Sequence, residues 1–104
     1  MAIVIVATIY PAPEYRDEVL AAHAKAQQTV HETEDGCLLY ALHEGPDGRL
    51  VMIEKYTDQA AVDAHISGAG LAALQAALAG KLTAPVDVQV LTPRPAGSAQ
   101  KGIL

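Results

Sequence analysis

Residues Glu34–Ile66, EDGCLLYALHEGPDGRLVMIEKYTDQAAVDAHI, decide the fold that we expect for this chain. Within them, Cys37–Gly45 and Arg49–Thr57 are two runs of β-competent residues. A short Gly45-Pro46-Asp47-Gly48 turn joins the two runs. The pattern predicts a β-hairpin.

The chain after the hairpin changes to a helical pattern. Asp58 is a candidate N-cap, and Gln59–Ile66, which carries His65, is the predicted helix. A hairpin that runs directly into a short helix can direct several polar groups into one pocket.

Neither face of the predicted hairpin is properly polar. On the first strand, one parity holds Leu38, Tyr40 and Leu42, and the other holds Cys37, Leu39, Ala41 and His43. The second strand divides into Val51, Ile53 and Lys55 against Leu50, Met52, Glu54 and Tyr56. A half-exposed antiparallel hairpin alternates apolar and polar residues, so we expect both faces to be covered. Helices would cover one face, and the sheet of a second, two-fold related subunit would cover the other.

The N-terminal segment predicts a strand followed by a helix. Ile3–Tyr10 is apolar at both parities, as in a strand buried on two faces, and Pro11-Ala12-Pro13 ends it. From Glu14 to about Glu32 the less polar residues recur every three to four positions, which predicts an amphipathic helix. Gly36 is the candidate left-handed residue that closes this helix.

The C-terminal segment predicts a further helix, a strand and a tail. After an interruption at Ser67–Gly70, Leu71, Leu74 and Leu78 mark a helix that Gly80 closes. Pro85–Thr92 alternates, with Val86, Val88 and Val90 inward and Asp87 and Gln89 outward. Pro93–Leu104 lacks periodicity, although Ile103-Leu104 could pack against a neighbour.

The resulting order is β-α-β-β-α-β, which predicts an α+β fold of the ferredoxin-like type. Two helical regions would cover one face of a four-stranded antiparallel sheet, and the open face would form the dimer. Residues 1–93 would make one domain, and residues 94–104 a C-terminal tail.

Composition excludes several classes of protein. The 104 residues carry a net charge of −5 and no basic cluster, so we expect no nucleic-acid partner. The longest apolar run is too short to span a bilayer, and no signal peptide is evident. A single cysteine fits a reducing compartment, so we predict a cytoplasmic protein with no membrane partner. There is no Phe or Trp, so four tyrosines supply the large aromatic surfaces.

His65 is the first candidate catalytic residue, because an imidazole on an apolar stretch of helix suits a general base. The alternative is a histidine that only fills space and bonds a carbonyl group. Glu54 is the second candidate, since a carboxylate within a strand needs a partner. Glu54 could orient His65 or accept a bond from a substrate, or it could pair with Lys55, Lys25 or Arg49.

Tyr40 and Tyr56 could line a pocket, or they could be core tyrosines with hydroxyls at the surface. His23, His31 and His43 form no convincing metal set, and surface positions suit them better. Cys37 has no basic neighbour in sequence and is expected to be a small core residue.

Three groups of residues together resemble the antibiotic biosynthesis monooxygenase (ABM) domain family. They are Asp35-Gly36-Cys37-Leu38-Leu39-Tyr40, Glu54-Lys55-Tyr56-Thr57-Asp58-Gln59-Ala60-Ala61 and Ala64-His65-Ile66. The similarity covers roughly residues 2 to 93. It implies a dimeric α+β barrel, with a pocket between sheet and helices in each subunit.

For function, the resemblance implies oxygenation of a quinol-like or polyphenolic substrate by O₂ without metal or other cofactor. His65 and Glu54 would be catalytic, and Tyr40, Tyr56, Leu42 and Met52 would bind the substrate. Haem-degrading relatives carry a pocket Asn and Trp, and this chain has neither. The alternative is a non-catalytic, dimeric module that binds a small molecule in the same pocket. A cofactor-free isomerase or ring-cleaving enzyme is a third possibility.

Overall fold

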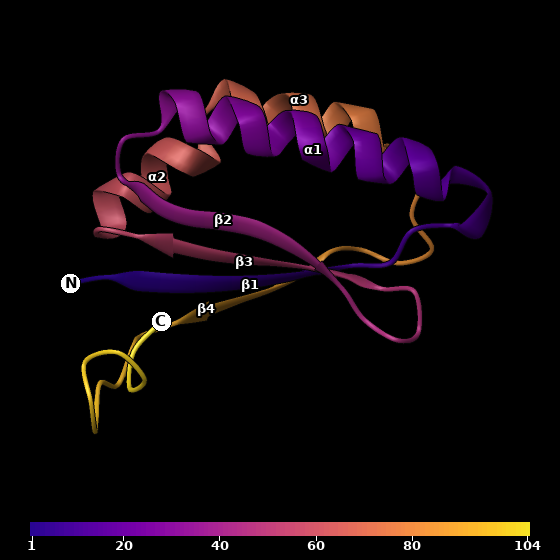
Figure 1. The fold of residues 1–104 in the computed structure, drawn as a ribbon. Helices are drawn as coiled ribbons and strands as arrows, with labels where there is room; N and C mark the ends of the chain where they lie inside the picture. Colours follow the sequence, from indigo (N-terminus) through magenta and orange to yellow (C-terminus); the bar gives the residue numbers. More distant parts are fainter.

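All helices lie on one face of a single sheet in the computed structural model, which describes residues 1–104 (Figure 1). The strands are β1 (Ile3–Ile9), β2 (Cys37–Glu44), β3 (Leu50–Tyr56) and β4 (Asp87–Leu91). The helices are the 3₁₀ turn η1 (Pro13–Tyr15), α1 (Arg16–Thr33), α2 (Gln59–Ile66) and α3 (Ala69–Leu78). None of them is both long and apolar enough to cross a membrane.

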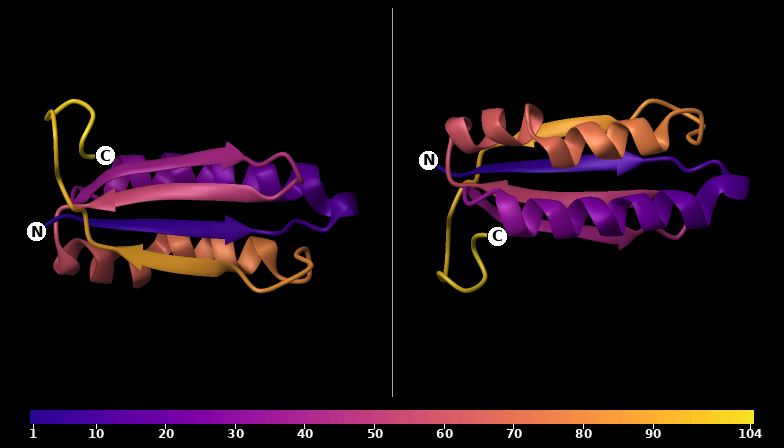
Figure 2. Two further views of the ribbon diagram at one scale, coloured as in Figure 1. Left: turned by 90° about the horizontal axis from the view of Figure 1, so that it is seen from below. Right: turned by 90° about the horizontal axis from the view of Figure 1, so that it is seen from above.

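The sheet has the order β2-β3-β1-β4, and every neighbouring pair is antiparallel. Figure 2 shows α1 and α3 side by side on one face of the sheet, running along the strands. The predicted ferredoxin-like α+β fold with a four-stranded antiparallel sheet is therefore confirmed. The predicted interruption between α2 and α3 is present but is limited to Ser67 and Gly68, since α3 begins at Ala69. The close of α3 near Gly80, where φ is 76°, is also present.

The core lies between the helices and the facing side of the central strands. Alternate residues of β3 are fully buried on this side, among them Leu50, Met52 and Tyr56. Val19, Ala26 and Val30 recur along one side of α1 and pack onto them, as the helical period requires. The large aliphatic residues therefore form one continuous layer under α1 and α3.

A β-bulge corrects the parity that we expected for β2. Cys37 pairs with Tyr56, and Leu39 pairs with Lys55, so Leu38 has no partner on β3. Cys37 and Tyr40 both contact the helix-side core, although residues three apart in a regular strand face opposite ways. Leu38 is accordingly 55% exposed and does not share the face of Tyr40.

Gly36 has a different role from the left-handed cap that we expected. Its φ is not positive; a Cβ at this position would instead lie 2.5 Å from the Cβ of Ala61 and 3.2 Å from Thr57 Oγ1. Gly36, which immediately precedes β2, therefore allows the backbone to pass directly against α2. The contact fixes the end of α1 beside the start of α2.

The valines of the β4 segment face the predicted side but remain uncovered. Val88 pairs with Ala7 and Val90 with Ile5, whose side chains belong to the helix-side core. Even so, Val86, Val88 and Val90 are 37%, 55% and 62% exposed. Because β4 is the edge strand and packs mainly on β1, no helix covers these valines.

The opposite face of the sheet is open apart from one end. Its centre is made of partly buried apolar side chains, including Val6, Ala41 and Ile53. The C-terminal tail turns beneath this face, and Lys55 Nζ donates a 2.6 Å hydrogen bond to the carbonyl oxygen of Leu104 (Figure 1). Ile103 and Leu104 thus lie near Val4 of their own chain.

Candidate active site

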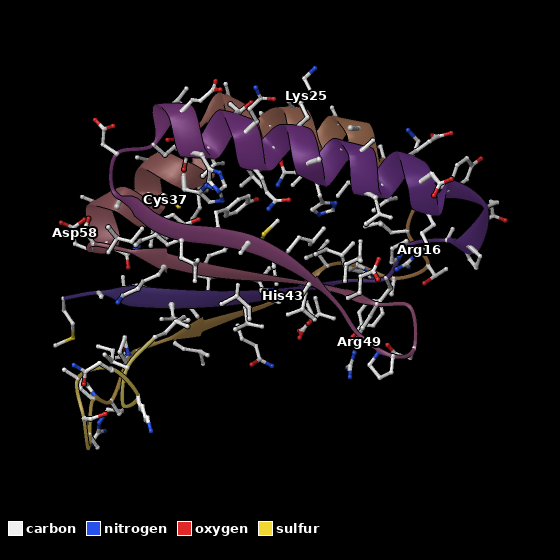
Figure 3. All side chains as sticks on the ribbon, viewed as in Figure 1. Arg16, Lys25, Cys37, His43, Arg49 and Asp58 are labelled. Atoms are coloured by element: carbon white, nitrogen blue, oxygen red, sulfur yellow. The ribbon has the colours of Figure 1, made fainter.

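A cavity of about 230 Å³ lies between the helices and the sheet. Its walls are mostly apolar, with contributions from β1, α3 and the β4 segment. The polar side chains that line it are His23, Tyr40, Glu54, His65 and Gln75. No Lys or Arg lines it: Figure 3 shows Lys25 pointing away from the sheet, and Arg16 and Arg49 at the hairpin-turn end.

Asp58 and two tyrosine rings hold His65 in place. The Asp58 side chain accepts a 2.9 Å bond from the backbone N–H of Ala61, which confirms the predicted N-cap of α2. His65, in the last turn of α2, is only 4% exposed. The ring centroids of Tyr40 and Tyr56 lie 5.3 and 5.2 Å from the imidazole. The imidazole is therefore packed between two aromatic walls.

Glu34 is the partner of His65 that the sequence did not reveal. Its Oε1 lies 2.7 Å from His65 Nδ1, and the two side chains are 12% and 5% exposed. A carboxylate oxygen accepts, so Nδ1 donates, and the short distance is that of a charge-assisted bond. Glu34 lies 31 residues before His65, at the end of α1. The close passage of Gly36 against Ala61 helps to bring the two together.

Glu54 is buried beside this pair and is bonded by a tyrosine. Tyr56 Oη donates a 2.6 Å bond to Glu54 Oε1, and His65 Nε2 lies 3.7 Å from the same oxygen. Burial raises the pKa of Glu54, while the bond from Tyr56 and the nearby His65 act in the opposite direction. Glu54 pairs with none of the basic residues Lys55, Lys25 and Arg49. The carboxylate that bonds His65 is that of Glu34.

The predicted substrate-binding residues divide into two groups. Tyr40 and Met52 line the cavity, whereas Tyr56 stands behind Glu54, and neither Tyr56 nor Leu42 is part of the lining. Burial raises the pKa of both Tyr40 and Tyr56, so their hydroxyl groups stay neutral at pH 7. The contacts of these four residues with a substrate stay predictions.

The proton positions at His65 follow from its partners. With Nδ1 donating to Glu34, the lone pair lies on Nε2 whenever the imidazole is neutral. No hydrogen bond reaches Nε2, yet no buried side-chain nitrogen or oxygen atom lacks a partner, so Nε2 is open to the cavity. An imidazole oriented by a carboxylate on one nitrogen can accept a proton at the other.

The remaining histidines and the cysteine lie in different environments. His23 is 1% exposed, which corrects the surface position that we expected. His31 is bonded through Nε2 to the carbonyl oxygen of Tyr40, and His43 is exposed on β2. Burial raises the pKa of the Cys37 thiol to about 11, so it is a neutral thiol at pH 7. No three His, Cys, Asp or Glu side chains are placed to hold a metal ion.

Comparisons with known proteins agree with this architecture. The chain is 36% identical over 98 residues to "Putative monooxygenase Rv0793" of Mycobacterium tuberculosis, which covers 93% of this chain and 96% of that protein. The structure of Rv0793 superimposes with a TM-score of 0.86 at 31% identity, over 94% of this chain and 100% of the other.

A second solved structure shares the fold alone. The Caulobacter crescentus CB15 protein described as a putative antibiotic biosynthesis monooxygenase has a TM-score of 0.83 at 24% identity, over 86% of this chain and 87% of the other. The sequence model of the antibiotic biosynthesis monooxygenase family matches residues 2–77, from before β1 into α3. With most of its length matched by that model and by Rv0793, the chain belongs to the antibiotic biosynthesis monooxygenase family.

Proposed function

We propose that this protein is a cofactor-independent monooxygenase that oxidises a quinol-like or polyphenolic substrate with O₂. One observation supports this most directly: His65 is oriented by Glu34 through Nδ1, and Nε2 is open to an apolar cavity. The names of the relatives, which call them monooxygenases, agree with such an activity.

The chemistry begins with a proton transfer at His65. Nε2 takes a hydroxyl proton from the quinol, and the resulting anion is electron-rich enough to transfer an electron to O₂. Combination of the two radicals forms a ring peroxide, which loses water. The balance is quinol plus O₂ giving hydroxyquinone plus H₂O, so one oxygen atom enters the product and the other leaves as water.

The cavity suits a neutral aromatic molecule. Its apolar walls would hold the ring and keep water away from the reduced oxygen species. Without Lys or Arg in the lining and with Glu54 present, a carboxylate or phosphate group would lack a counter-charge. The volume of about 230 Å³ exceeds the roughly 150 Å³ that holds benzene but is below the roughly 300 Å³ of drug-sized pockets. One- and two-ring quinols therefore fit better than three-ring anthrones.

Oxygen uptake by the purified protein tests the proposal. Metal-free protein is mixed with hydroquinones, naphthoquinols and anthrones under ¹⁸O₂, and product masses are read in the same runs. We expect uptake above the autoxidation background and one labelled oxygen atom per product. His65→Ala should remove the enzymatic part, whereas His43→Ala, at an exposed histidine, should keep it. Equal rates for the wild type and His65→Ala would remove His65 from the mechanism.

The binding module is the second outcome of the same experiment. It is favoured by the small number of polar groups in the cavity, because ligand binding without a reaction would account for all of them. Saturable binding of the quinols, measured as a rise in melting temperature, together with no oxygen uptake, would replace the enzyme with a ligand-binding protein.

We also propose that the open sheet face pairs with a second copy of this chain. Val6, Ala41 and Ile53 form the centre of that face, and polar residues such as Thr8, His43 and Gln89 surround it. An apolar centre with a polar rim is typical of a subunit interface. Sedimentation at micromolar concentration should give a dimer, and Ile53→Glu should give a monomer. A monomeric wild type would contradict this proposal.

A further inference from the structure

His23 is a buried histidine that the proposed reaction does not use. It lies on α1, is 1% exposed and lines the same cavity as His65. Its Nδ1 is 2.9 Å from the carbonyl oxygen of Val19. Because a carbonyl oxygen can only accept, Nδ1 must donate, and the tautomer of the neutral ring is fixed with its lone pair on Nε2.

The lone pair on His23 Nε2 has no partner within the protein. Nδ1 makes the only hydrogen bond of this ring, and no buried side-chain nitrogen or oxygen atom lacks a partner. His23 lines the cavity, which is where a partner for Nε2 can bind. Burial lowers the pKa of His23, which keeps the ring neutral and the lone pair available, while the bond to Val19 acts in the opposite direction.

His23 and His65 lie at different levels of the cavity. His23 precedes Glu34, the partner of His65, by 11 residues, which is about 16 Å along a helix axis. The cavity wall follows β1 from Ile5 to Ile9, a length of about 13 Å. Apolar side chains such as Ala7, Met52 and Leu74 form the wall over this length. The cavity is thus a long apolar space with polar groups at separate positions.

We propose that His23 is a second substrate-binding residue, whose Nε2 accepts a hydrogen bond from a hydroxyl group remote from His65. The ligand class is an aromatic diol with its hydroxyl groups at opposite ends. One hydroxyl gives its proton to His65, and the other donates to His23. The ligand class rests on the proposed function, but the accepting role of His23 does not depend on turnover.

Binding without oxygen tests this assignment separately from catalysis. Anaerobic calorimetric titrations compare 2,6-dihydroxynaphthalene with 2-naphthol, which lacks the second hydroxyl group. The wild type should bind the diol about fivefold more tightly, the effect of one hydrogen bond. His23→Leu should lose this preference while keeping its affinity for 2-naphthol. Gln75→Leu, at an uncharged polar residue that lines the cavity from α3, is the control and should keep the preference.

A measurement on the wild type covers the case in which His23→Leu does not fold. The ¹⁵N resonance of His23 Nε2 should shift when the diol is added and should stay unchanged with 2-naphthol. A diol preference that survives in His23→Leu, or one that is lost in Gln75→Leu instead, would overturn the proposal. An unmoved resonance, or no diol binding by the wild type, would overturn it as well. Absence of oxygen uptake alone would refute only the proposed reaction.

Discussion

The core between the helices and the sheet has two ends, which are buried to a similar degree but differ in the chemistry of their side chains. At the end near the hairpin turn, Ile9, Val19 and Leu50 are almost completely buried among other aliphatic side chains. At the end near α2, Tyr56 and Val62 are also buried, but Tyr56 bonds Glu54 and packs against His65, two buried polar side chains. We call these the aliphatic end and the polar end.

The difference lies in how each end depends on geometry. Burial of aliphatic surface stabilises the fold in proportion to area and in any orientation. A buried polar group stabilises the fold only if its partner is in place, since an unpaired group costs more than its bond contributes. The aliphatic end therefore holds the layers together, and the polar end selects one arrangement of them. That selected arrangement is the candidate active site.

The largest expected effect comes from a deletion at the aliphatic end. Leu50 is 0% exposed among the aliphatic side chains of this end, so Leu50→Ala loses transfer free energy and leaves a cavity. We expect a loss of about 2–5 kcal/mol in the free energy of unfolding, measured by urea denaturation. Leu38→Ala, at a leucine that is 55% exposed, is the control and should change it by less than about 0.5 kcal/mol.

At the polar end, removal of the Glu34 carboxylate from its bond with His65 should lower the free energy of unfolding by less than Leu50→Ala does. Glu34→Ala leaves the N–H of His65 Nδ1 buried without an acceptor, which should cost about 1–3 kcal/mol. Glu34→Gln keeps an accepting oxygen atom and should recover part of the loss. Glu32→Ala, at an exposed glutamate on the same helix, should show no change. Equal denaturation midpoints for Glu34→Ala and Glu32→Ala would show that the bond to His65 contributes nothing.

The two ends should also respond to pH in opposite directions. His23, among the aliphatic residues of α1, has a pKa lowered from 6.5 by burial. Below pH 6.5 the unfolded chain takes up a proton that the folded ring does not, so stability should fall as the pH falls. The slope should reach at most about 1.4 kcal/mol per pH unit. At the polar end, Glu54 has a pKa raised above 4.5, so its contribution falls as the pH rises above that value.

Two variants separate these contributions in urea denaturation at a series of pH values. His23→Gln should flatten the loss of stability below pH 6.5. Glu54→Gln should leave the contribution of His23 unchanged and should make the observed pH dependence of stability steeper between pH 4.5 and 6.5, since the opposing contribution of Glu54 is gone. An unchanged slope in His23→Gln would contradict the assignment to His23.

The smallest expected effect concerns the cap that places the polar end. Asp58→Ala removes the side-chain acceptor for the N–H of Ala61 at the start of α2, at a cost of about 1 kcal/mol. Asp58→Ser keeps a capping oxygen atom and should recover most of the stability. If the melting temperatures of Asp58→Ala and Asp58→Ser coincide, the cap does not hold α2.

Regular patterns in the sequence predicted most of the fold. The turn at Gly45–Gly48, the N-cap at Asp58 and the bounds of α2 depend on neighbouring residues, and local physics determines them. The bulge at Leu38 and the role of Gly36 depend on contacts with β3 and α2, which residue spacing does not record. At those two features the predictions of the fold were wrong.

The candidate site was predictable only in part for the same reason. His65 and Glu54 stand out because polar residues in apolar segments need an explanation. Glu34 and His23 lie in a helix with many polar residues, where nothing in the spacing separates a buried side chain from an exposed one. Tertiary contacts alone distinguish Glu34 from Glu32, and His23 from the other polar residues of α1.

The bulge at Leu38 has a consequence for the gene. Since Leu38 is the one residue of β2 without a partner on β3, loss of its codon would leave all the other residues of the strand in register. Loss of the codon for Ala41 would instead turn either Tyr40 or Leu42 to the opposite face. Loss of the codon for Leu38, or of the codon for Leu39, which gives the same protein sequence, is thus a deletion that a descendant of this gene could carry and still build the same pocket.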